Sequence, residues 1–178
     1  DPMRYIKWHP GDSIGISRYS YSGYSIFRNV KEEIDETGMF KGETGSSNTY
    51  CSIFPFNVIS VYSNNTYTLE LPMVQYYQPN SFGREAYPMA GKKTESDKNI
   101  LFQNLCGVIV INLLGTETVE SISFSAKGAE GNPLPVCGRG TVNMSQANYS
   151  TLTMSGEDNV VTLVCEDGVT LDPVTPTP

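Results

Sequence analysis

Residues 101–126 read LFQNLCGVIVINLLGTETVESISFSA, and three expected β-strands follow one another in this stretch. The runs Ile100–Gln103, Gly107–Leu114 and Val119–Ala126 are short, rich in β-branched and apolar residues, and separated by turn residues. The middle run is apolar at neighbouring positions, which is typical of a strand buried on both faces. We therefore expect Val108–Ile111 to lie buried in a central strand of a packed sheet.

The same strand-like signal recurs along the rest of the chain. Thr66–Leu71 (TYTLEL) alternates most cleanly, and we expect Tyr67, Leu69 and Leu71 to share one face. The other expected strands are Ser13–Ser17, Gly23–Phe27, Met39–Phe40, Thr49–Phe56, Gly138–Met144, Leu152–Met154 and Val160–Val164.

Two segments lack a regular strand pattern. Pro72–Lys98 carries several Pro and Gly residues and is either a functional loop or an irregular edge segment. Val30–Thr37 is the one helix candidate, but it is short and acidic, so a charged turn fits equally well. Short strands without β-α-β alternation indicate an all-β sandwich or barrel with short irregular loops and little helix.

Composition and charge exclude several classes of function. Twelve basic and 19 acidic residues give a net charge of −7, which opposes binding to nucleic acid and to anionic lipid. No apolar run approaches the roughly 20 residues of a membrane-spanning helix. The sequence begins at Asp1-Pro2 without a signal peptide, which fits a cytosolic protein or a trimmed exported one.

Four cysteines, Cys51, Cys106, Cys137 and Cys165, form no CxxC pair. Three of them lie in apolar, strand-like runs, and a domain of this size does not need covalent bridges. We expect buried free thiols, and one or two disulfides in an exported protein are the alternative. A zinc site is not expected, because the single histidine lies far from every cysteine in sequence.

The sequence offers little that could carry catalysis. His9 is the only imidazole, and no oriented partner is evident beside it. Four acids, Glu32, Glu33, Asp35 and Glu36, gather on one segment and are typical of a solvated face rather than of a catalytic pair. No phosphate-binding glycine loop is present. We predict no enzyme activity and no catalytic, cofactor-binding or metal-ligating residue.

Tyrosines are the remaining candidates for ligand binding. Tyr19, Tyr21 and Tyr24 lie close together in sequence, and Tyr76 and Tyr77 lie in the irregular segment. Such rings either fill a core or form a platform on which sugars stack. The core interpretation is favoured, because the sequence arranges no basic or amide partners with them.

An ordered set of short motifs resembles the fimbrillin-like family of Bacteroidales-type bacteria. The motifs are GDSIG (11–15), GMF (38–40), YCSIFPF (50–56), LPMVQYY (71–77), PMA (88–90), LFQNLCGVIVINLLG (101–115), VESISFSA (119–126) and VVTLVCEDGVTL (160–171). The resemblance covers nearly the whole chain in order, and it implies a transthyretin-like Greek-key β-sandwich over residues 1–171. Residues 172–178, which are Pro-rich, would then be a linker toward a further C-terminal domain.

The resemblance also implies a function. It predicts a non-enzymatic structural or adhesive protein of the cell surface, a pilus subunit or pilus-associated adhesin that exchanges β-strands with other fimbrial subunits. It implies export as a lipoprotein precursor to the outer membrane or an extracellular fimbrium, with surface glycans or proteins as further partners. It carries no catalytic residue. A glycan-binding module of a surface lipoprotein is the alternative function.

Overall fold

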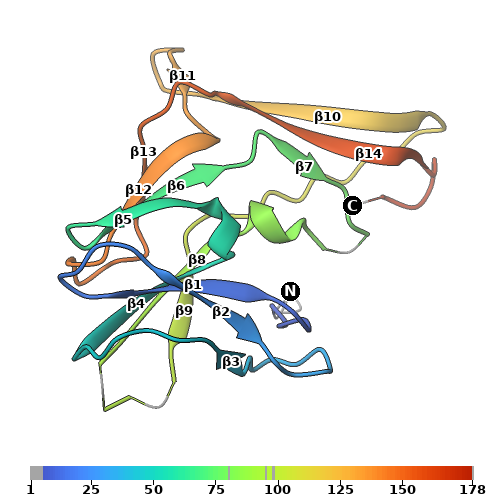
Figure 1. Cartoon of the computed structure of the whole chain (residues 1–178). Coiled ribbons are helices and arrows are strands. Elements are labelled where there is room, and N and C mark those ends of the chain that lie inside the picture. Colours follow the sequence, from blue (N-terminus) through green and yellow to red (C-terminus); the bar gives the residue numbers. More distant parts are fainter. Residues whose placement is uncertain (1–5, 80, 95, 98, 178) are drawn as a thin grey trace.

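A computed structural model describes residues 6–79, 81–94, 96–97 and 99–177. The described residues are all-β: their strands form three sheets, and they contain no α-helix (Figure 1). Two short 3-10 turns, Phe56–Val58 and Arg84–Ala86, are the helical elements in this part of the chain. Residues 1–5 of the predicted domain, Asn80, Glu95 and Lys98 of the irregular segment, and Pro178 of the predicted linker lie outside the described residues.

The largest sheet has six strands and is antiparallel throughout. Its order is β3 (Phe40–Lys41), β2 (Ser25–Asn29), β1 (Ser13–Arg18), β4 (Thr49–Phe54), β8 (Met89–Thr94) and β9 (Leu101–Asn104). The strand predicted at Thr49–Phe56 ends at Phe54, directly before Pro55, which has no N–H to donate. The predicted brief strand at Phe40 lies at the edge of this sheet.

A four-stranded antiparallel sheet, called here the β5–β6 sheet, supplies the other half of the main core. Its order is β13 (Leu152–Met154), β12 (Gly138–Asn143), β6 (Thr66–Leu71) and β5 (Ile59–Ser63). Tyr67, Leu69 and Leu71 of β6 are buried on one face, which confirms the alternation expected there. They form one apolar cluster with Ile53 of β4 and Val142 of β12, so this cluster joins the two sheets.

A second apolar cluster lies around Trp8, in the segment that precedes β1. Trp8 packs with Ile14 and Ile16 of β1, Phe54 of β4 and Met89 of β8. The six-stranded sheet is therefore covered by apolar packing on both faces, which fits the buried pattern of β1.

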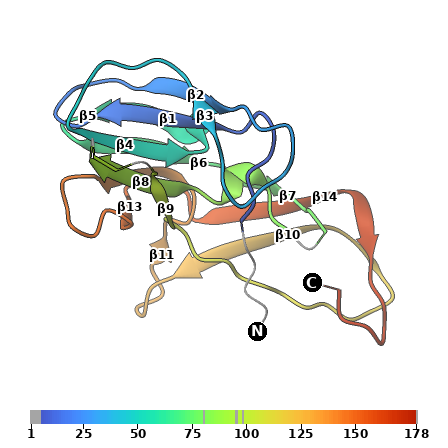
Figure 2. The same ribbon diagram turned by 90° about the horizontal axis from the view of Figure 1, so that it is seen from below.

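The third sheet, called here the β10–β14 sheet, differs from the other two. Its order is β11 (Pro133–Leu134), β10 (Thr118–Lys127), β14 (Val160–Thr170) and β7 (Val74–Tyr76), with β7 parallel to β14 and the other pairs antiparallel. The long strands β10 and β14 run side by side, apart from the six-stranded sheet, in both views (Figures 1 and 2). Neither apolar cluster of the described residues includes a residue of this sheet.

The prediction of a buried central strand at Gly107–Leu114 is wrong. Residues Val108–Ile111 form no strand, and their side chains are 43–64% exposed. Within the described residues, the run Gly107–Leu114 makes one β-type pairing, an isolated bridge between Leu113 and Thr177. An apolar run signals that its side chains require cover, but it does not say whether this chain supplies strands on both sides of it.

Other differences concern segments with weak patterns. The strands β5, β7, β8 and β11 were not among those expected from the sequence, and β7 and β8 fall within the irregular segment Pro72–Lys98. Val30–Thr37 forms bends and one bridge residue, which confirms the turn interpretation over the helix. In the predicted linker, Asp172 accepts hydrogen bonds from the N–H groups of Val174 and Thr175, and the chain turns back.

Candidate functional site

The strand β10 has one edge along which, over most of its length, no described strand is hydrogen-bonded. On its other edge, β14 pairs with β10 from Thr118 to Ser125. On the edge in question, β11 pairs only with Ala126 and Lys127. Unpaired main-chain N–H and C=O groups along an edge form a template for another strand. The main chain from Thr118 to Ser125 is therefore open to strand addition.

The two faces of the β10–β14 sheet have opposite character. On one face, Ile122 lies opposite Leu163 and Phe124 lies opposite Val161, so apolar cross-strand pairs line it. On the other face, the Ser123 and Thr162 hydroxyls are 3.1 Å apart and hydrogen-bonded. This alternation is normal for a sheet with one buried face, yet Phe124 is still 38% exposed. The apolar face is thus incompletely covered.

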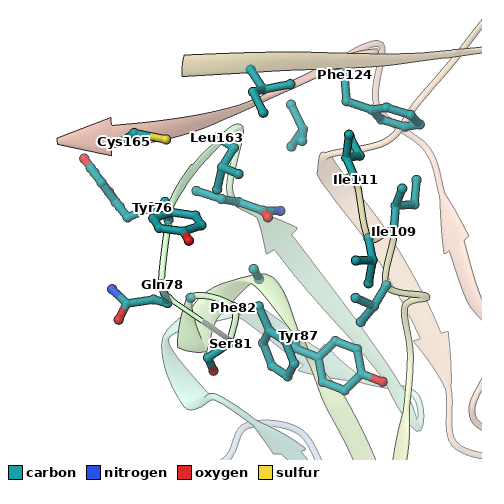
Figure 3. A pocket seen from close by; sticks show the side chains of 18 of the residues that line it. Tyr76, Gln78, Ser81, Phe82, Tyr87, Ile109, Ile111, Phe124, Leu163 and Cys165 are labelled. Carbon is teal, nitrogen blue, oxygen red and sulfur yellow. The ribbon is translucent and has the colours of Figure 1, made fainter. Parts of the chain in front are cut away.

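A cavity of about 340 Å³ lies against this apolar face. Its second wall is the irregular apolar run that includes Ile109 and Ile111, and its third wall is the segment that includes Phe82 and Tyr87 (Figure 3). A cavity of this size with mainly apolar walls suits apolar side chains or a small apolar ligand. The run that was predicted to be a central strand, Gly107–Leu114, therefore lines a cavity and does not form part of a sheet.

Cysteine chemistry does not mark this cavity as catalytic. Cys106 and Cys165 both line it, and the four cysteines are free thiols in the structure. Burial raises the pKa of the Cys106 thiol, so this thiol stays neutral and weakly nucleophilic near neutral pH. The pKa of the neighbouring Tyr87 phenol is also raised, mainly by burial and to a smaller extent by the electrostatic effect of Cys106.

The histidine lies in a turn that precedes β1. The His9 N–H donates to the Asp12 carboxylate at 2.7 Å, and its C=O accepts from the Asn29 amide at 2.9 Å. These contacts give the residue a structural role in the turn. No group of three or more His, Cys, Asp or Glu side chains that could hold a metal occurs among the described residues.

The acidic segment likewise serves local structure. The Asp35 carboxylate accepts hydrogen bonds from the Lys31 ammonium and from the Thr37 N–H. The hydrogen bond from Lys31, followed by that from Thr37, lowers the pKa of this carboxyl. Its neighbours Glu32, Glu33 and Glu36 are exposed or partly exposed. An exposed, paired carboxylate in a turn is the solvated face that the sequence indicates.

The structure separates the tyrosines into different places. Tyr76 and Tyr77 line the cavity beside β14. Tyr19 and Tyr21 line a different hollow, at the end of β1. The Tyr24 hydroxyl donates to the Ile59 C=O at 3.5 Å, and this residue does not line that hollow. A single platform of Tyr19, Tyr21 and Tyr24 therefore does not form.

No protein-family model, curated protein or solved structure matches this chain. The resemblance to the fimbrillin-like family consequently stays a prediction. Within the described part of the chain, no helix is both long and apolar enough to cross a membrane. The open edge of β10 was not predicted, because an edge depends on which strands are absent beside it, and the pattern of a single strand does not carry that information.

Proposed function

We propose that this protein is a non-enzymatic structural or adhesive subunit of the cell surface, which assembles with other subunits by β-strand exchange. The observation that carries the proposal is the open edge of β10 beside an incompletely covered apolar face. An added strand would form main-chain hydrogen bonds with Thr118–Ser125, and its alternate side chains would cover Ile122 and Phe124. Strand addition thus removes both unpaired backbone and exposed apolar surface.

The proposal includes the finer architecture and the location that the sequence motifs suggest. The chain would form a transthyretin-like Greek-key sandwich, and the protein would be exported as a lipoprotein precursor to the outer membrane or a fimbrium. The net charge of −7 supports a subunit that stays soluble until it meets its partner. The resemblance of the ordered motifs supports the same assignment.

Site-specific cross-linking from the open edge tests this function. Ser123→Cys, on the polar face of β10, would carry a photoreactive maleimide in the full-length subunit produced by its native host. We expect cross-links between subunits in surface material, with the partner peptide identified by mass spectrometry. A subunit that stays monomeric at high concentration and never cross-links to a second copy would contradict strand exchange.

Two matched substitutions on neighbouring residues sharpen the test. Phe124→Glu places a charge on the apolar face and should abolish the cross-link, because the carboxylate would be buried by the incoming strand. Ser125→Glu changes an exposed residue beside it, for which we expect the cross-link to be retained. Circular dichroism would establish that both variants keep the fold.

A further inference from the structure

A second hollow lies at the end of the six-stranded sheet where β1 ends and β4 begins. Residues 19–21 form one side of this cleft and residues 46–49 form the other, around a volume of about 380 Å³. The Tyr19 N–H donates to the Thr49 C=O at 3.0 Å, which ties the two sides together. None of these residues lines the cavity beside β14, so the cleft is separate from the surface proposed for strand exchange.

Hydrogen bonds fix the shape of the loop that precedes β4. The Ser47 N–H donates to the Tyr50 hydroxyl at 3.0 Å, and that hydroxyl donates to the Gly45 C=O at 3.3 Å. The Ser47 hydroxyl donates to the Thr49 C=O at 2.8 Å. These hydrogen bonds satisfy polar groups inside the loop and fix its shape. This side of the cleft is therefore preorganised before a ligand binds.

A cation is held beside one side of the cleft. The Arg18 guanidinium carbon lies 4.1 Å from the centroid of the Tyr21 ring. A Cβ on Gly45 would come within 2.6 Å of an Arg18 guanidinium nitrogen, so the missing side chain of this glycine leaves room for the guanidinium. Arg18 makes no salt bridge to a described residue. With respect to the described residues, its fork of donors is therefore available to bind a planar anion.

A second cation lies near the other tyrosine. The Lys92 ammonium is 4.9 Å from the centroid of the Tyr19 ring and donates to the Met144 C=O at 2.8 Å. No residue that lines the cleft is acidic, although the protein as a whole has 19 acidic and 12 basic residues. Neither cation lines the cleft itself, but each lies against the ring of a tyrosine that does, and this placement favours an anionic ligand.

Unpartnered polar groups and aromatic surface complete the lining. The Asn48 amide and the Ser20 and Ser46 hydroxyls make no hydrogen bond to a described residue. Tyr21 remains 51% exposed although Arg18 covers one part of its ring. Ring surface beside hydroxyl and amide groups is the chemistry that binds a sugar, through C–H packing and hydrogen bonds to its hydroxyls.

The backbone at the rim is strained, which supports a functional role for this corner. Ser20 has a φ of 64°, a left-handed conformation that is unfavourable for a residue other than glycine. The Ser20 N–H donates to the Asn65 carbonyl oxygen at 2.6 Å, and this bond holds the conformation. Strained residues that the surrounding structure fixes in place are concentrated at binding sites.

We infer that this cleft binds an acidic sugar, a pyranose that carries a carboxylate, within a surface glycan. The carboxylate lies at Arg18, the sugar ring packs on Tyr21, and Asn48 and Ser46 receive its hydroxyl groups. A volume of about 380 Å³ lies in the range of ligand pockets and admits a single sugar unit with part of its neighbour. Uronic acids and sialic acids share this chemistry.

Chemical-shift titration of the ¹⁵N-labelled chain tests the inference. The probes are methyl β-glucuronide, N-acetylneuraminic acid and the neutral control methyl β-glucoside. We expect one acidic sugar to bind with a Kd of about 1 mM, with shifts concentrated at residues 18–21 and 46–49. The probe that binds identifies the source of the carboxylate, and the neutral glucoside should bind at least about tenfold more weakly.

Variants separate the roles of the ring and the cation. Tyr21→Ala should remove binding, whereas Tyr24→Ala, at an exposed tyrosine outside the cleft, should leave it unchanged. Arg18→Gln should bring the affinity for the acidic sugar down to that for the glucoside. The spectrum outside the cleft reports whether each variant is folded. Equal binding of acidic and neutral sugars, shifts located elsewhere, or no saturation at tens of millimolar would overturn the inference.

Discussion

Trp8 and Asp35 exchange two main-chain hydrogen bonds, from the Trp8 N–H at 2.7 Å and from the Asp35 N–H at 3.0 Å. This bridge ties the segment before β1 to the connection between β2 and β3. The indole ring then meets Phe40, Phe54 and Phe102 edge-on, with centroids 4.9, 4.9 and 5.3 Å away. Three aromatic contacts from different strands make Trp8 the centre of the second apolar cluster.

Removal of this indole should destabilise the protein strongly. Trp8→Ala would leave a cavity among three phenylalanine rings, at a cost of about 3–5 kcal/mol. At this chain length that corresponds to a fall in Tm of about 6–20 °C, measured by circular dichroism. Trp8→Phe keeps an aromatic ring and should cost less. Equal melting temperatures for Trp8→Ala and the parent protein would contradict the packing described here.

Val110→Asp should have little effect on stability. In a buried central strand, this change would cost several kcal/mol because it would bury an unpaired charge. Val110 is instead 53% exposed and outside any strand, so we expect a change of less than about 0.5 kcal/mol. The matched control is Ile53→Asp, at a residue that is fully buried in β4 and should not tolerate the charge. Denaturant unfolding measures the free energy of unfolding of both variants. A large loss of stability in Val110→Asp would favour the central-strand assignment again.

Much of the strand content could be predicted from local patterns, since alternation alone determines which side chains of a half-buried strand turn inward. Thr66–Leu71 is the clearest case, with β6 at the predicted bounds and its expected face buried. Met89–Thr94 was missed, because Gly91 and two lysines obscure the alternation of a strand that lies inside the six-stranded sheet. Its position inside the sheet depends on β4, which is distant in sequence, as well as on the nearby β9.

The candidate sites depended even more on tertiary placement. Arg18 precedes the tyrosines near residue 20 in the sequence, but the local pattern does not show that its guanidinium lies on a tyrosine ring. The fold brings Arg18 onto Tyr21, Lys92 toward Tyr19, and Asn48 to the opposite side of the cleft. Lys92 comes from β8, whose partner strand β4 directly follows the loop that carries Asn48. This arrangement follows from strand order, which local periodicity does not encode.

The cysteines should be protected thiols that become reactive when the protein unfolds. Burial raises the pKa values of Cys51, Cys106 and Cys137, so little thiolate is present near neutral pH. We expect slow alkylation of the native protein, with the half-buried Cys106 reacting first. In denaturant without reductant, all four cysteines should react. If fewer than four cysteines react in protein isolated from its host, disulfides have formed.

High pH should weaken the protein through two buried tyrosines whose rings lie against each other at a tilt in the main core. The rings of Tyr62 and Tyr67 have centroids 4.5 Å apart, and burial is the main cause that raises the pKa of both phenols. In the unfolded chain these phenols ionise near pH 10, whereas in the folded protein they stay neutral to higher pH. Their contribution to stability is therefore complete below about pH 10 and is lost as the pH rises toward the folded-state pKa values.

Urea denaturation from about pH 8 to about pH 11 measures this loss. Above about pH 10, each of the two tyrosines should reduce the free energy of unfolding by up to about 1.4 kcal/mol per pH unit. Tyr62→Phe removes one of these groups together with its hydrogen bond to Asn65, so the variant should be less stable at pH 8 but should lose stability less steeply above pH 10. Parallel pH dependences for the parent protein and Tyr62→Phe would show that this phenol does not ionise on unfolding, and the proposed origin of the alkaline transition would be wrong.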